Sequence, residues 1–224
     1  MVRTLKKGPA VGGRHMEAML LAGEIGETLR QMYWPDWTLI KPETIIRLFN
    51  KAKVRFVLMG TYGINGYRYQ ARATQDVDIL VQEKDHAKAV TLVREKYPKL
   101  KVQDFPVVTR FLDPKTDKPV IDLMKPTNAS LQAVFKNTVL IKKSHLIPNL
   151  EMGLISKFAA MVSPNRQKEK KLQDAADFAD MVVNNRDAIN MEKLGRLAEV
   201  VYSGGLKEVM QLVEDILAGR PIKI

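Results

Sequence analysis

Two aspartates separated by a single residue are the part of the sequence best suited to chemistry. Asp76 and Asp78 open the run DVDILV, residues 76–81. Alternate residues of a β-strand face the same side, so the two carboxylates share one face and the apolar residues share the other. Neighbouring carboxylates repel each other unless a cation lies between them, and a pair of Mg²⁺ ions about 3.5–4 Å apart would neutralise both. Two hydrated aspartates at the end of a strand are the alternative.

A third acidic residue lies in a later apolar run. Asp122 is the one charged residue of VIDLM, residues 120–124. Burying a carboxylate in such surroundings is costly unless the carboxylate is paired or binds a metal ion. Asp122 is therefore a candidate metal ligand, and a hydrated strand end is the alternative.

Gly60 follows a β-rich apolar run and precedes an expected short helix. Backbone N–H groups at such a turn can bind a triphosphate, and Thr61 adds a hydroxyl donor. Just before the acidic pair, Arg72 could neutralise phosphate and Thr74 could fix the loop through a side-chain hydrogen bond. An ordinary strand-to-helix turn and purely structural roles for Arg72 and Thr74 are the alternatives.

One lysine and two aspartates in the second half of the chain are further candidates. Lys157 lies in the apolar run LISKFAA, residues 154–160, which predicts an inward-pointing ammonium with a phosphate or carboxylate partner. A lysine that reaches along the surface at a helix boundary is the alternative. Asp174 and Asp177 are three residues apart on one helix face, and this spacing fits surface ion pairs as well as an active-site role.

Apolar periodicity and chain breakers indicate the elements that position these residues. The sequence predicts helices over residues 15–32 and 84–96, a helix that begins near Pro42, and one capped by Asn149. Strands are predicted over residues 54–59, 77–81, 106–112 and 119–124.

After residue 126 the pattern predicts helices only. The expected fold class is therefore α+β, with a small mixed sheet flanked by helices and a C-terminal helical bundle. Three regions follow from this pattern: an N-terminal helical extension over residues 1–37, an α/β core over 38–126 and a helical domain over 127–224.

Composition narrows the classes of function. The chain has 224 residues and no cysteine, which excludes disulfides, zinc–thiolate sites and thiol nucleophiles. No apolar run is long enough to cross a bilayer and no secretory signal is recognisable, so we expect a cytoplasmic protein without a membrane partner. A net charge of +11 favours nucleotide or nucleic-acid partners, although a basic protein without such a partner has the same composition.

Together these segments resemble the core of the DNA-polymerase-β-like nucleotidyltransferase superfamily. The resemblance is carried by FVLMGTYG at residues 56–63, by RATQDVDILV at 72–81 and by Asp122 on a later strand. The Arg-x-Thr before the acidic pair, the lysine in an apolar helix and the spaced aspartates resemble the abortive-infection, AbiEii-like toxin branch. The sequence departs from the family pattern at Thr61, where a second glycine or a serine is usual, and at Gly63, where alanine is usual.

The resemblance implies a Mg²⁺-dependent enzyme that transfers a nucleotide from a nucleoside triphosphate such as ATP to an acceptor hydroxyl. The acceptor would be RNA such as tRNA, a protein or a small molecule, and a toxin–antitoxin role would add a cognate antitoxin as partner. A catalytically inactive nucleotide- or RNA-binding module of the same fold is the alternative. The resemblance assigns two Mg²⁺ ions and catalysis to Asp76, Asp78 and Asp122, triphosphate binding to Gly60, Thr61, Arg72 and Lys157, and supporting positions to Thr74, Asp174 and Asp177.

Overall fold

The computed structural model describes residues 11–222 with the exception of Trp34 and Trp37. The described chain divides into two compact units. The first unit comprises residues 11–66 and 70–147, and the second comprises residues 67–69 and 148–222. The short segment 67–69 therefore leaves the first unit and returns to it, and each unit is described separately below.

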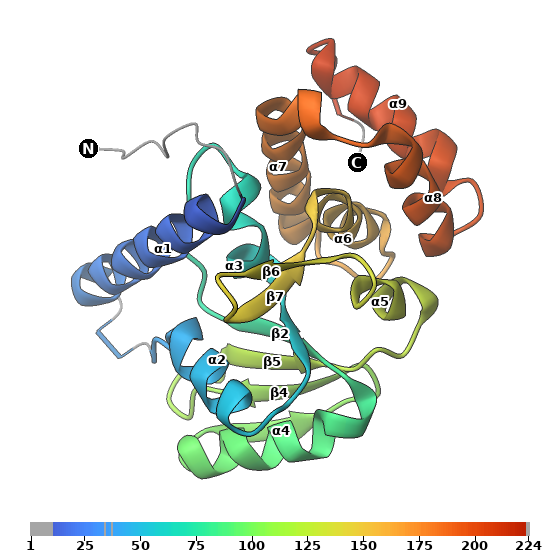
Figure 1. Ribbon diagram of the computed structural model, residues 1–224. Helices are drawn as coiled ribbons and strands as arrows, with labels where there is room; N and C mark the ends of the chain where they lie inside the picture. Colours follow the sequence, from blue (N-terminus) through green and yellow to red (C-terminus); the bar gives the residue numbers. More distant parts are fainter. Residues whose placement is uncertain (1–10, 34, 37, 223–224) are drawn as a thin grey trace. The chain divides into compact units, whose positions relative to one another are not determined.

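The first unit is built on a seven-stranded mixed sheet with the strand order β3-β4-β5-β2-β1-β7-β6 (Figure 1). The parallel pairs are β2–β5 and β1–β7, and the pairs β1–β2, β3–β4 and β4–β5 are antiparallel. The strands are β1 Phe56–Leu58, β2 Val77–Val81, β3 Lys101–Asp104, β4 Val108–Leu112, β5 Pro119–Met124, β6 Thr138–Ile141 and β7 His145–Pro148.

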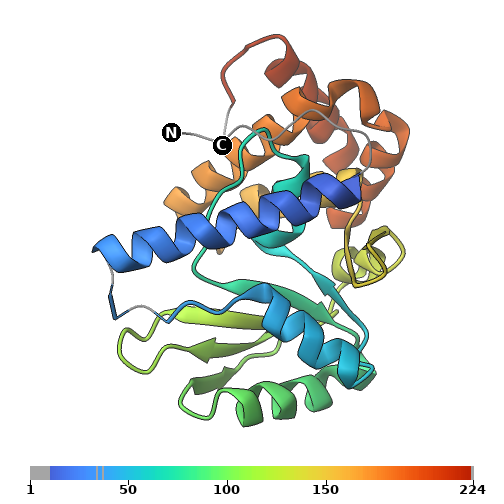
Figure 2. The same cartoon turned by 60° about the vertical axis from the view of Figure 1, so that its left-hand side comes forward.

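Helices cover this sheet. Figure 2 shows α1 as a long helix that passes along the unit, and α2 packs against α4, which in turn contacts β2 and β5. The helix predicted to begin near Pro42 is confirmed as α2, and Ile45, Ile46 and Phe49 form its buried face. The helices of this unit are α1 Val11–Tyr33, α2 Pro42–Lys51, α3 Gly60–Ile64 with the 3₁₀ turn Asn65–Tyr67, α4 Glu83–Lys96 and α5 Ala129–Val134.

The second unit contains helices α6 to α9. Asn149 caps α6, as predicted, because its Oδ1 accepts a hydrogen bond from the backbone N–H of Met152 at 3.0 Å. No helix in the described residues is both long and apolar enough to cross a membrane. The helices are α6 Leu150–Val162, α7 Lys168–Asn185, α8 Met191–Val201 and α9 Gly205–Leu217, with a 3₁₀ turn at Arg186–Ala188.

The predicted fold class is confirmed, but the expectation of helices alone after residue 126 does not hold. Residues 138–141 and 145–148 form the strands β6 and β7. Both runs are rich in Val, Leu and Ile, yet the residues between them are Lys142, Lys143 and Ser144, which carry no glycine or asparagine turn signal. The exposed edge strand β3 was not predicted either, because only one of its four residues is apolar.

A pair of buried histidines joins the start of α1 to β7. The Nε2 atoms of His15 and His145 lie 3.2 Å apart, and both side chains are almost fully buried. Burial, together with the smaller effect of the neighbouring His145, lowers the pKa of His15 to about 3. Burial also lowers the pKa of His145 to about 4. Both rings are therefore neutral in the folded protein at neutral pH.

This pair predicts that the protein loses stability in mildly acidic solution. The folded pKa values lie below the unfolded value of about 6.5, so the unfolded chain binds protons first and the stabilisation present above pH 6.5 is lost as the pH falls. Between about pH 7.5 and about pH 5 each histidine should remove about 2 kcal/mol from the free energy of unfolding.

Urea unfolding at several pH values measures this loss. The double variant His15→Gln/His145→Gln should show a much flatter pH dependence than the wild type. His86→Gln is the matched control, because His86 is only half-buried and pairs with neither histidine, and it should leave most of the dependence intact. An equally steep dependence in the double variant would contradict this account.

Candidate functional site

The sheet register places three charged residues in one row. Asp78 of β2 lies opposite Asp122 of β5, and Asp122 lies opposite Arg110 of β4. Residues directly opposite each other on neighbouring strands project from the same face of a sheet, with Cβ atoms about 4.5–5.5 Å apart. The row Arg110–Asp122–Asp78 therefore runs across three adjacent strands on a single face.

Arg110 holds both oxygens of Asp122. Its Nε lies 2.9 Å from Oδ1 and its Nη2 lies 2.8 Å from Oδ2, which is the paired geometry that makes arginine–carboxylate contacts strong. These hydrogen bonds raise the pKa of Arg110; burial opposes the effect, and the charges of Asp122, Asp76 and Asp78 add to it. Asp122 is only 7% exposed, so the sheet supplies a cation where the carboxylate is buried.

Sequence reasoning did not identify Arg110 as part of the site. The signal for Arg110 was its charge within the strand VTRFL, residues 108–112. Its side chain lies on the face opposite the buried Thr109 and Phe111. Its contact with Asp122 depends on the register between β4 and β5, which the sequence pattern does not determine.

Among the described residues, no group of three or more His, Asp or Glu side chains is placed to hold a metal ion. Asp76 and Asp78 are both half-buried, and Thr74 donates a hydrogen bond from Oγ1 to Asp76 Oδ1 at 2.6 Å. Mg²⁺ typically takes one or two carboxylates and completes its shell with water and phosphate oxygens, so this pair has suitable donor chemistry. The three-carboxylate centre stays a prediction.

Gly60 lies directly against Asp78, the second residue of the acidic pair. Its φ of +56° is in the left-handed region, and a Cβ atom at this position would lie 1.9 Å from Asp78 Oδ2. The backbone N–H of Met59 donates to the carbonyl of Asp78 at 2.8 Å and so holds the turn in place. The structure therefore brings the start of α3 into contact with the carboxylate of Asp78.

Arg72 and Thr61 lie together beside this turn. Arg72 Nη2 donates to Thr61 Oγ1 at 2.7 Å. Asn65 fixes the backbone of Arg72 from both sides, with its Nδ2 donating to the Arg72 carbonyl at 3.0 Å and its Oδ1 accepting from the Arg72 N–H at 3.3 Å. The guanidinium is therefore positioned by the residues that follow Gly60.

Lys157, Asp174 and Asp177 belong to the second unit, where they form an ion cluster. Lys157 Nζ lies 2.8 Å from Asp174 Oδ1 and 2.8 Å from Asp177 Oδ2, and all three side chains are buried. Arg166 binds the other oxygen of Asp174 at 2.8 Å, and Arg68 binds Asp177 at 3.0 Å. The ammonium of Lys157 points inward, and its partners are carboxylates. Its assignment to triphosphate binding stays a prediction.

We expect Gly60→Ala to damage the site through a steric clash. The new methyl group would overlap Asp78 Oδ2 and the backbone would be strained at positive φ, so the free energy of unfolding should fall by about 1–3 kcal/mol. Gly23→Ala is the matched control, because a Cβ atom there meets nothing within 4 Å in the middle of α1 and should be neutral or stabilising. Urea unfolding compares the two variants, and equal stabilities would contradict the close approach of Gly60 to Asp78.

We expect Lys157→Met to destabilise the second unit. The substitution keeps the length of the side chain but leaves two buried aspartates with less compensating charge, which should cost about 3–5 kcal/mol. Lys170→Met, at an exposed position of α7, should change stability by less than about 0.5 kcal/mol. Chemical unfolding followed by circular dichroism distinguishes the two variants. A wild-type stability for Lys157→Met would mean that the cluster does not stabilise the fold.

Comparisons with known proteins yield similar solved structures only. No family model matches the sequence, and no curated protein matches it. A nucleotidyltransferase-like antigenic protein from Paracoccidioides brasiliensis is 12% identical, with 95% of each chain covered and a TM-score of 0.43. The antibiotic-resistance factor ANT(2'')-Ia is 11% identical, covering 80% of this chain and 95% of its own, with a TM-score of 0.47. Terminal uridylyl transferase 4 from Trypanosoma brucei with bound dUTP is 12% identical, covering 75% and 60%, with a TM-score of 0.31.

Proposed function

We propose that this protein is a Mg²⁺-dependent nucleotidyltransferase, which moves a nucleoside monophosphate from a nucleoside triphosphate to an acceptor hydroxyl. The observation that carries the proposal is the contact between Gly60 and Asp78, which sets a backbone turn directly beside the Asp76–Asp78 pair. A turn that touches a carboxylate pair provides a metal-binding group and a phosphate-binding group at adjacent positions. These are the two groups that a metal–triphosphate complex requires.

Asp76 and Asp78 would hold Mg²⁺, which when bound neutralises phosphate charge and lowers the pKa of a coordinated hydroxyl. Thr74 keeps Asp76 in place through its hydrogen bond. Asp122 lies next to Asp78 in the sheet and is our candidate for the third ligand and for the acceptor of the proton from the attacking hydroxyl. Arg110 binds both of its oxygens, but Oδ1 accepts a single hydrogen bond from Arg110 and keeps a second lone pair for either role.

The triphosphate would be bound by the turn and its neighbours. Arg72 is half-buried and held beside Thr61, so it presents positive charge and hydrogen-bond donors close to Gly60. Such fixed donors stabilise charge on phosphate oxygens without reorganising during the reaction. In the second unit, Lys157 directs two of its three N–H groups to Asp174 and Asp177, and its assignment to triphosphate binding stays a prediction.

The reaction would be an in-line displacement at the α-phosphorus. The oxygen of the acceptor hydroxyl forms a bond to this phosphorus, the bond to the bridging oxygen breaks, and pyrophosphate leaves. The hydroxyl proton passes to a base, for which Asp122 is the candidate. The protein therefore contributes mainly position and charge rather than a covalent intermediate.

The net charge of +11 favours RNA as the acceptor, because basic proteins concentrate polyanions at their surface. A protein acceptor, a small-molecule acceptor and a toxin that pairs with an antitoxin protein are competing versions of the same activity. They differ in the size class of the labelled product.

A second candidate function is a binding module that holds nucleotide without transferring it. Two observations favour it: Arg110 binds both oxygens of Asp122, and the described residues contain no metal-binding group of three or more His, Asp or Glu side chains. In this version Asp76 and Asp78 would still bind Mg²⁺ with a triphosphate, but nothing would be transferred.

Incubation with each α-labelled nucleoside triphosphate, Mg²⁺ and cell extract tests the proposal. Label should move to one size class, and Asp76→Asn should reduce the rate by about a hundredfold or more, because one metal ligand is lost. Asp117→Asn removes an exposed aspartate that pairs with Lys101 and should transfer at the wild-type rate. Equal labelling by the wild type and Asp76→Asn would contradict the site. Binding of Mg²⁺–triphosphate with no transfer to any acceptor would favour the binding module.

A further inference from the structure

Three exposed lysines adopt a backbone conformation that usually belongs to glycine or asparagine. The φ angles of Lys53, Lys142 and Lys143 are +55°, +43° and +56°, and Asp117 is the only other non-glycine residue with positive φ in the described chain. A Cβ atom makes this conformation unfavourable, so residues found there often mark a functional constraint.

Lys53 occupies the position just beyond the C-terminus of α2 where glycine is commonest. The backbone N–H of Lys53 donates to the Asn50 carbonyl at 3.0 Å, and the N–H of Val54 donates to the Phe49 carbonyl at 3.0 Å. These two bonds define a Schellman motif, in which the left-handed residue is usually glycine. The sequence has lysine at this position instead.

Lys142 and Lys143 form the tight turn of the β6–β7 hairpin. The N–H of Ser144 donates to the carbonyl of Ile141 at 2.7 Å, and the two lysines between them both have positive φ. Two-residue hairpin turns with this pattern strongly prefer Asn-Gly or another pair containing glycine. Here both positions are lysine, and both side chains are exposed.

The helix end and the hairpin turn are neighbours in the first unit. Asn50 Nδ2 donates to the carbonyl of Ser144 at 2.7 Å and joins the two segments directly. Lys88 of α4 reaches the same place, because its Nζ donates to the carbonyl of Ala52. We call the exposed ammonium groups gathered here the lysine patch, which comprises Lys51, Lys53, Lys88, Lys142 and Lys143.

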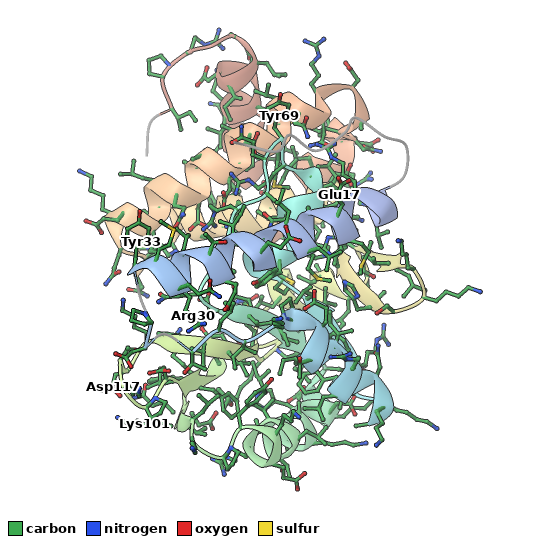
Figure 3. All side chains as sticks on the ribbon, turned by 90° about the vertical axis from the view of Figure 1, so that its left-hand side faces the viewer. Glu17, Arg30, Tyr33, Tyr69, Lys101 and Asp117 are labelled. Carbon is green, nitrogen blue, oxygen red and sulfur yellow. The ribbon has the colours of Figure 1, made fainter. Side chains whose placement is uncertain are left out.

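The lysine patch is not neutralised by carboxylates. None of its five members forms an ion pair with a described residue, and the nearby Asp85 instead accepts a hydrogen bond from the backbone N–H of Arg55 at 2.9 Å. Three other lysines of the unit do form ion pairs, namely Lys101, Lys115 and Lys125; Figure 3 labels Lys101 and Asp117, whose ion pair measures 2.7 Å. Lysines at the C-terminus of α2 also interact favourably with the dipole of the helix. This interaction does not explain the two lysines of the hairpin turn.

We propose that the lysine patch binds the sugar–phosphate backbone of an RNA strand. A cluster of exposed, unpaired ammonium groups on a chain with net charge +11 binds polyanions through phosphate contacts and counterion release. Lysine at three positions that favour glycine or asparagine indicates that charge there is kept at the expense of backbone stability. The choice of RNA over other polyanions rests on the proposed transfer to an RNA acceptor.

The patch is separate from the candidate active site. It adjoins the beginning of β1 at Phe56 and the beginning of β7 at His145, whereas Gly60 follows the far end of β1. The two strands run parallel, so the patch and Gly60 lie at opposite ends of the sheet. An RNA bound at the patch would therefore be held by a second region of the protein, away from the reacting hydroxyl.

The variant Lys142→Asn/Lys143→Gly tests the proposal, because it installs the preferred turn residues while it removes two charges. Its melting temperature should equal or exceed that of the wild type. Its affinity for a fluorescein-labelled single-stranded RNA should fall about tenfold at low salt, and the slope of log K against log salt should become shallower by about 1.4, since each lost phosphate contact removes about 0.7. Fluorescence anisotropy across a sodium chloride series, without nucleotide or Mg²⁺, measures both quantities.

Lys96→Gln/Lys99→Gln is the matched control, because it removes the same charge from exposed positions at the end of α4 and just beyond it. This control should keep the wild-type salt slope. Lys53→Gly should weaken binding and also raise the melting temperature.

Several results would overturn the proposal. They are an unchanged slope in the turn variant, an equal loss in the control, tighter binding of a DNA strand of the same sequence, or competition by anionic lipid vesicles that depends on the lysine patch. Because the RNA-binding assay contains no nucleotide, its outcome does not depend on the transfer reaction. A wild-type protein that transfers nucleotide to a short acceptor but binds no RNA would contradict the lysine patch alone, and one that binds RNA through the patch but transfers nothing would contradict the transfer reaction alone.

Discussion

The contact between the Gly60 backbone and the Asp78 carboxylate is the constraint on which the site depends. The antiparallel pairing of β1 with β2 places Leu58 opposite Ile79. The next backbone hydrogen bond, from the N–H of Met59 to the carbonyl of Asp78, extends this pairing to the turn at Gly60. The start of α3 then touches the carboxylate at a distance that leaves no room for a side chain. Thr61 and Arg72 take their positions from this turn, so the candidate phosphate-binding groups follow from one close backbone approach.

Both units place buried carboxylates beside cations of their own. In the first unit the sheet register pairs Asp122 with Arg110, and in the second Lys157 lies between Asp174 and Asp177. A buried carboxylate without such a partner would be strongly destabilising, so these pairs explain how acidic residues are tolerated in apolar surroundings. In the first unit, Arg110 already binds Asp122. Asp76 and Asp78 are therefore the remaining candidates for metal binding.

Local patterns predicted what depends on neighbouring residues, and they missed what depends on distant pairing. The period of two in residues 76–81 predicted the strand β2, and Asn149 predicted the start of α6, because a strand face and a helix cap involve only adjacent residues. The hairpin β6–β7 was missed because lysines replace the residues that signal its turn. The contact between Arg110 and Asp122 was missed because it requires the register of two strands, which a sequence pattern leaves open.

The central claim is that Asp76, Asp78 and the Gly60 turn together bind a metal–triphosphate complex. A crystal structure with Mn²⁺ and a triphosphate analogue that cannot be cleaved at the α–β bridge tests this claim most directly. We expect an anomalous Mn²⁺ peak in contact with Asp76 and Asp78, with phosphate oxygens at the turn near Gly60 and Arg72. A triphosphate bound elsewhere, or an anomalous peak that touches neither aspartate, would contradict it.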